Sequence, residues 1–111
     1  MELNLAMYIL VNKDIKIGKG KLAGQVGHAV ATYFYRGNYS PSLMDSYMKE
    51  QKKIILACSQ EKLEELEQSG YIAIRDLGLT QLEAGTLTCV NVGIINRDLE
   101  VPAFLRSLKI Y

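Results

Sequence analysis

A short loop of alternating glycine and lysine is the segment of the sequence best suited to bind an anion. Residues 17–21 read Ile-Gly-Lys-Gly-Lys and lead into a helix predicted over residues 21–35. Glycine lets a backbone approach a ligand closely, and the free N–H groups at a helix N-terminus attract negative charge. The spacing is not that of a Walker A motif, so the loop fits a solvated turn about equally well.

Polar side chains follow this loop at helical spacing. Lys21, Gln25, His28 and Thr32 are separated by four, three and four residues, which places them on one face of the predicted helix. This polar stripe could extend an anion site from the loop, or it could be the solvent face of an amphipathic helix. His28 is the single histidine of the chain, so a relay between two histidines is excluded.

A second polar segment, residues 76–81, reads Asp-Leu-Gly-Leu-Thr-Gln and directly follows a predicted strand. Open α/β sheets tend to carry functional groups at this position. Asp76 could orient a hydroxyl group or a water, Thr80 and Thr88 could hydrogen-bond a substrate, and Lys21 could stabilise an oxyanion. From spacing alone, a turn capped by the Asp76 side chain is the favoured interpretation.

The elements that must position these residues alternate between strand and helix. Strands are predicted over residues 7–11, 54–58, 71–75 and 86–95, and helices over residues 21–35, 41–51, 59–69 and 101–108. This alternation predicts an α/β fold, with residues 1–111 forming a single domain. We expect Gly24, Gly27 and Ala31 to let the first helix approach a sheet closely.

Charge and cysteine usage narrow the class of protein. Residues 1–53 carry a net charge of +4 and residues 54–111 a net charge of −3, which favours a local anion site over a generally basic surface. Cys58 and Cys89 lie inside apolar runs without the spacing of a metal site or a disulfide, so a cytoplasmic protein with reduced cysteines is expected. No segment approaches the length of a membrane span, and no membrane partner is expected.

Taken together, residues 16–29 and 76–88 resemble the two signature segments of the peptidyl-tRNA hydrolase type 2 family. The first reads Lys-Ile-Gly-Lys-Gly-Lys-Leu-Ala-Gly-Gln-Val-Gly-His-Ala, and the second is Asp-Leu-Gly-Leu-Thr-Gln followed by Gly85, Thr86 and Thr88. The chain end Leu-Lys-Ile-Tyr is similar to that family's C-terminus. The resemblance covers nearly the whole chain and implies a four-stranded mixed β-sheet flanked by helices on both faces, in a protein that is usually a homodimer.

The resemblance also implies a function, namely hydrolysis of the ester that joins a peptide to the 3′ end of tRNA. Neither a metal nor another cofactor is expected. By position, the residues implied in catalysis are Lys21, Asp76, Thr80 and Thr88. Those implied in substrate binding are Lys19, Gly20, Gln25, His28 and Gln81. In this interpretation Asp76 and Thr80 position or activate water, while Lys21 stabilises the oxyanion or holds the terminal phosphate.

Two positions depart from the family pattern. Leu79 stands where the family commonly has arginine, and Glu83-Ala84 stands where it usually has Ala-Pro. The first departure removes a cation able to pair with phosphate, and the second adds a negative charge near the predicted site. They keep two alternatives open: a non-catalytic RNA- or partner-binding member of the same fold, and a small phosphoanion-binding protein.

Overall fold

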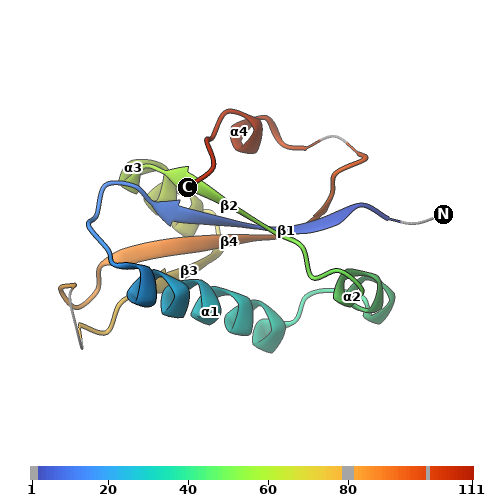
Figure 1. Ribbon diagram of the computed structural model, residues 1–111, viewed down its shortest axis with the longest axis horizontal. Coiled ribbons are helices and arrows are strands. Elements are labelled where there is room, and N and C mark those ends of the chain that lie inside the picture. Colours follow the sequence, from blue (N-terminus) through green and yellow to red (C-terminus); the bar gives the residue numbers. More distant parts are fainter. Residues whose placement is uncertain (1–2, 79–81, 100) are drawn as a thin grey trace.

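A four-stranded mixed sheet forms the centre of the computed structural model, which describes residues 3–78, 82–99 and 101–111 (Figure 1). The strands are β1 (Leu5–Asn12), β2 (Lys53–Cys58), β3 (Ile72–Arg75) and β4 (Leu87–Asn96), in the order β2-β1-β4-β3. β1 is parallel to β2, whereas β4 is antiparallel to both β1 and β3. The sheet implied by the family resemblance is thereby confirmed.

β1 separates two hydrophobic cores. Leu5, Met7, Ile9 and Val11 belong to one core, and the intervening Ala6, Tyr8 and Leu10 belong to the other. All eight residues of the strand are buried, because helices cover both faces of the sheet. This burial explains why the strand is continuously apolar rather than alternating in sequence.

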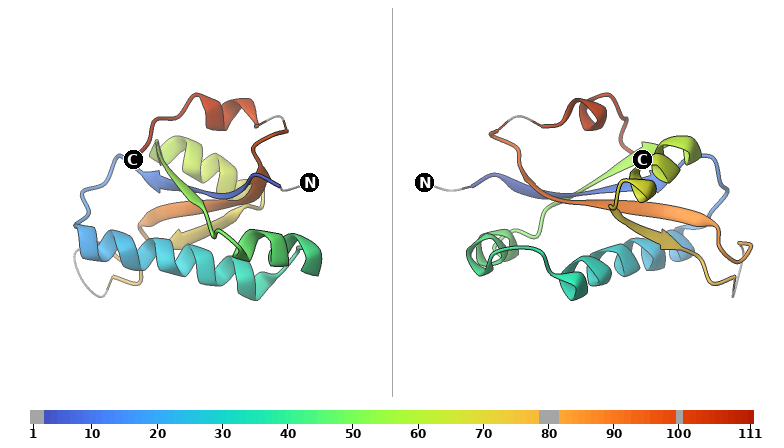
Figure 2. Two further views of the ribbon diagram at one scale, coloured as in Figure 1. Left: turned by 45° about the vertical axis from the view of Figure 1, so that its right-hand side comes forward. Right: turned by 180° about the vertical axis from the view of Figure 1, so that it is seen from behind.

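Helices lie on both faces of the sheet, as Figures 1 and 2 show. α1 (Lys19–Arg36) and α2 (Pro41–Met48) cover one face, and α3 (Gln60–Gln68) and the short α4 (Ala103–Arg106) cover the other. Ser40 and Ser59 cap α2 and α3 with their side-chain oxygens, which accept from backbone N–H groups three residues on. No helix in the described ranges is long and apolar enough to cross a membrane.

Several predicted boundaries and one predicted contact were wrong. α1 begins two residues early, at Lys19, and α2 ends at Met48, short of Gln51, whose φ of 52° is incompatible with a right-handed helix. The last helix spans only Ala103–Arg106. Gly24 and Gly27 do not face the sheet: a Cβ added at either position would meet no atom within 4 Å, and it is Ala29 that is fully buried.

Both cysteines are buried and free, as expected from their apolar surroundings. Burial raises the pKa of Cys89 to about 11 and also raises that of Cys58. A thiol that stays protonated is a poor nucleophile, so both side chains act as small apolar core residues.

Candidate active site

A cavity of about 430 Å³ opens between α1 and the segment that continues β3. All four members of the predicted polar stripe line it from the helix: Lys21, Gln25, His28 and Thr32. Residues 73–77 line it from the sheet. The stripe therefore faces a cavity, and the interpretation as a plain solvent face was wrong for Gln25, which is only 4% exposed.

Lys21 and Asp76 form an ion pair at this cavity. The ammonium nitrogen of Lys21 contacts Oδ1 of Asp76, and the side chains are 15% and 2% exposed. The second carboxylate oxygen accepts a hydrogen bond from the backbone N–H of Gly78 at 2.8 Å. The bond from Lys21 holds the pKa of Asp76 below its usual range despite its burial, so the carboxylate is ionised at neutral pH.

Gln25 and Thr88 hold the Asp76 side chain of this pair in place through two buried hydrogen bonds. The Gln25 amide donates to Oδ1 of Asp76 at 3.4 Å, and its oxygen accepts from the hydroxyl of Thr88 at 2.8 Å. The same hydroxyl lies 3.0 Å from the Ile74 carbonyl oxygen. Thr88 is 1% exposed and is not among the residues lining the cavity. The site is thus a buried chain of polar contacts that ends at the Lys21–Asp76 pair.

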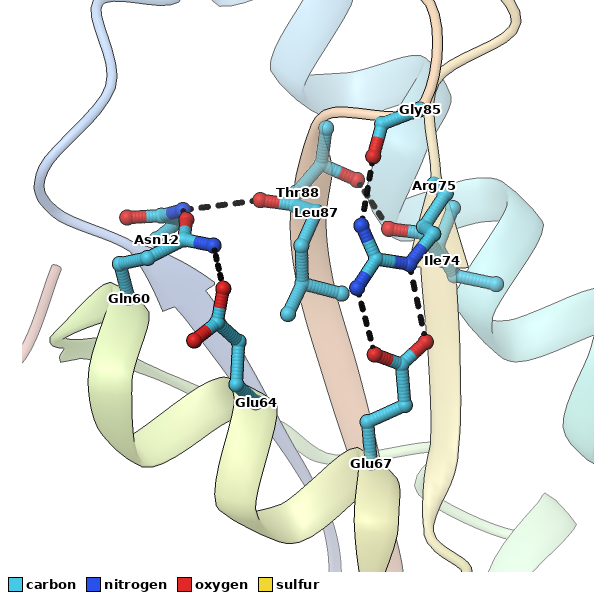
Figure 3. Close-up of polar contacts among 9 residues, drawn as sticks. All are labelled: Asn12, Gln60, Glu64, Glu67, Ile74, Arg75, Gly85, Leu87 and Thr88. Carbon is cyan, nitrogen blue, oxygen red and sulfur yellow. Dashed lines mark hydrogen bonds and ion pairs between the residues drawn. The ribbon is translucent and has the colours of Figure 1, made fainter.

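An irregularity in β4 places Thr88 in this position. Ile74 pairs with Cys89, but Arg75 pairs with Leu87, so Thr88 is left over between the two pairs. An extra residue of this kind rotates a strand locally and redirects its side chains. The carbonyl of the adjacent Leu87 is held by the buried Asn12 amide at 2.8 Å (Figure 3). This end of β4 is therefore fixed from both neighbouring strands.

Sequence reasoning did not identify Arg75 as part of the site. Its guanidinium donates two hydrogen bonds to the Glu67 carboxylate, at 3.0 and 2.6 Å, and a third to the Gly85 carbonyl at 2.6 Å (Figure 3). The pair lowers the pKa of Glu67. The position of this arginine directly before Asp76 was the available signal for a role at the site. The sequence cannot show which acidic residue of α3 is its partner. Arg75 lies at one end of the segment between β3 and β4 and bonds Gly85 near the other end, so its contact with Glu67 links both ends of this segment to α3.

The remaining predicted site residues have different positions. Lys19 and Gly20 are exposed in the first turn of α1 and are not among the residues lining the cavity. Thr80 and Gln81 lie outside the described residues, as does Leu79. The binding role of Lys19 and Gly20 and the roles of Thr80 and Gln81 therefore stay predictions.

Replacing Gly78 with alanine is expected to lower the free energy of unfolding by about 2–3 kcal/mol. Gly78 has a φ of 79°, and an added Cβ would lie 2.8 Å from the backbone nitrogen of Ala84. Gly24→Ala is the matched control, because it lies on open helix surface and is expected to stabilise the protein by about 1 kcal/mol. Urea unfolding of both variants measures the difference, and equal shifts in the same direction would contradict the role of Gly78.

Replacing Thr88 with valine is expected to cost about 1–3 kcal/mol of folding free energy, because the buried Gln25 oxygen loses its donor. Thr88→Ser keeps the hydroxyl group and is expected to retain most of the folding free energy that Thr88→Val loses. Urea unfolding of both variants provides the measurement. Two variants that are equally stable would show that the hydroxyl group is not required for this stabilisation.

The fold and the cavity define a small α/β protein with a polar site built around a lysine–aspartate pair. A family model described as peptidyl-tRNA hydrolase PTH2 matches residues 5–111. The chain belongs to this family.

Three relatives, each named peptidyl-tRNA hydrolase, show the extent of the similarity. The protein of Methanopyrus kandleri is 40% identical over 93 residues, which cover 77% of this chain and 80% of the relative. That of Methanococcus vannielii is 37% identical over 111 residues, with 92% and 95% covered. That of Methanocaldococcus jannaschii is 35% identical over 115 residues, with 96% and 99% covered.

Proposed function

We propose that this protein hydrolyses the ester bond of peptidyl-tRNA and releases free peptide and tRNA. The observation that carries the proposal is the Lys21–Asp76 pair at the wall of an open cavity, in a chain that matches the PTH2 family over residues 5–111. The relatives that bear the name peptidyl-tRNA hydrolase span nearly the same length as this chain. We further propose that residues 1–111 act as one catalytic domain.

Asp76 and Lys21 divide the work in this mechanism. Water attacks the ester carbonyl, its proton passes to the carboxylate of Asp76, and the tRNA oxygen leaves with that proton. Because the pKa of Asp76 is lowered, the carboxylate is a weak base: it orients the water and holds the transferred proton only until the tRNA oxygen takes it. As Asp76 takes up the proton, the Lys21 ammonium turns towards the negative charge that develops on the carbonyl oxygen.

Other residues bind the substrate or hold the pair in place. Gln25 and Thr88 are positioning residues, because the buried hydrogen bonds from Thr88 to Gln25 and from Gln25 to Asp76 fix the Asp76 carboxylate. His28 lines the cavity and contacts the substrate. Lys19 and the N–H groups near Gly20 bind phosphate at the tRNA 3′ end, as an open helix N-terminus does. Thr80 and Gln81 complete the water and substrate contacts, by resemblance.

The reaction needs no metal and no other cofactor in this proposal, since a carboxylate, a hydroxyl group and a cation are sufficient for an activated ester. Over the described ranges, no group of three or more His, Cys, Asp or Glu side chains is placed to hold a metal ion. Activity is expected to survive dialysis against a chelator. Loss of activity that returns with a divalent metal would contradict this.

Two further properties follow from the proposed substrate and the family resemblance. The protein acts in the cytoplasm, where tRNA is used in translation, and it forms a homodimer. Light scattering at micromolar concentration measures the second property, and a mass near 12.4 kDa, that of one chain, would exclude the dimer.

The deciding experiment is release of labelled peptide from a model peptidyl-tRNA by the purified protein. Turnover that depends on Lys21 and Asp76 supports the proposal. Binding of tRNA without turnover would support a non-catalytic RNA-binding protein instead, in which Leu79 and Glu83 have removed the activity. Equal competition by inorganic phosphate and by tRNA would support a simple phosphoanion-binding protein.

A further inference from the structure

A second cavity continues the first along α1. It measures about 410 Å³ and shares Arg36 with the first cavity. Residues 70–72 line the second cavity and residues 73–77 the first, so every residue from 70 to 77 borders one of them. Successive side chains of a strand point to opposite faces. Such an unbroken series therefore indicates a groove that follows the backbone edge of β3.

This edge of β3 is open. β3 is the last strand in the sheet order, and no strand among the described residues pairs with its outer side. The N–H and C=O groups of Asp76 bond to Thr86 and Gly85, just before β4, and the Ile74 carbonyl oxygen lies 3.0 Å from the side-chain hydroxyl of Thr88 on β4. Because peptide groups alternate between the two edges of a strand, those of Ala73 and Arg75 point outwards into the groove.

The chemistry of the second cavity, which is the part of the groove away from Lys21 and Asp76, favours a peptide over a nucleic acid. Arg36 is the only cation lining the second cavity in the part of the chain that the structure describes. A nucleic-acid strand requires several cations along its phosphates. The other residues there are uncharged, and apart from Asn38 and Asn91 they are apolar, aromatic or glycine. They can accept side chains of differing size beside an extended backbone.

We propose that this groove binds the peptide part of the substrate as an extended strand added to the outer edge of β3. The inference rests on the proposed hydrolase function. The ester carbonyl lies at Lys21 and Asp76, which follow the C-terminal end of β3, so the peptide runs parallel to β3 and its earlier residues extend towards Gly70. Main-chain hydrogen bonds suit a substrate whose sequence varies, because every residue except proline offers the same N–H and C=O groups.

The first test compares substrates on the unaltered protein. N-acetyl-alanyl-tRNA carries one residue, and N-acetyl-tetra-alanyl-tRNA reaches along β3. We expect kcat/KM to be about tenfold higher for the longer substrate, through KM, since each added hydrogen bond gives a factor of roughly two to ten. N-methylation of single amides in the longer peptide is expected to remove this gain at alternate positions, because only every second residue bonds to β3.

A variant of the edge provides an independent test. Ala73→Pro removes an outward N–H group while proline remains tolerated on an edge strand, and Ala73→Gly is the control that loses only the methyl group. The ratio of kcat/KM for the long and short substrates is expected to fall towards one in Ala73→Pro alone. Equal rates for both substrates on the unaltered protein would overturn the inference and leave the hydrolase function intact. The same holds if N-methylation has an equal effect at every position of the peptide. Absence of turnover with both substrates would overturn the inference and the hydrolase function together.

Discussion

Asp76→Asn is expected to lower kcat for peptidyl-tRNA hydrolysis by about 100-fold or more, the usual contribution of a carboxylate that positions or accepts a proton. Asparagine keeps the shape of the side chain but loses the charge that holds Lys21 and the proton acceptor for water. KM is expected to change little, because the groups proposed to bind the substrate remain. Single-turnover release of peptide measures the effect on the chemical step directly.

The matched control for this variant is Asp45→Asn, which neutralises an exposed carboxylate on α2. Its kcat is expected to stay within a factor of two of the unaltered protein. Circular dichroism and unfolding curves establish that both variants are folded. An Asp76→Asn variant that is folded and as active as the control would exclude Asp76 from the mechanism.

Lys21→Met is expected to lower kcat by about 100-fold, because it removes the cation proposed to stabilise the developing oxyanion. It is also expected to raise the pKa of Asp76, whose largest lowering influence is the bond from Lys21. In the unaltered protein the stabilisation from ionised Asp76 is present above the usual aspartate pKa of about 3.9, and is lost as the pH falls through the lowered folded pKa. In Lys21→Met the carboxylate protonates at a higher pH.

Carbon-13 NMR of the aspartate carboxyl groups follows this titration without relying on residual activity. Lys49→Met is the control, since Lys49 is exposed at the end of α2 and its loss leaves the Lys21–Asp76 pair intact. Unchanged titration of Asp76 in Lys21→Met would show that the ion pair does not set its pKa in solution.

Local periodicity predicted one half of the site and could not predict its partner. The spacing of Lys21, Gln25, His28 and Thr32 requires a common helix face, and the structure confirms that face at the cavity. Periodicity does not reveal what covers a face, so the burial of Gln25 against Asp76, 51 residues away, was not predictable from it. Only the resemblance brought the Asp76 segment to the same site.

The sequence pattern located most strands and helices but left their arrangement open. A continuous apolar run such as that of β1 predicts burial on both faces, which is observed. It contains no information on strand order, so the resemblance had to supply the sheet. The prediction for Gly24 and Gly27 failed because small residues permit close packing without requiring it. Arg75 was missed because its role depends on a bidentate contact with Glu67 that forms only in the folded chain.

The position of β4 links the order of folding to the assembly of the Lys21–Asp76 site. Among the described strands, β3 pairs with the sheet only through β4, although β4 follows it in the sequence. Asp76 therefore cannot reach Lys21 in its final geometry until residues 87–96 have inserted between β1 and β3. During synthesis from the N-terminus, the earlier segments emerge first but cannot yet form the Lys21–Asp76 ion pair. The topology thus delays assembly of this pair, and of the activity proposed for it, until most of the chain has been made.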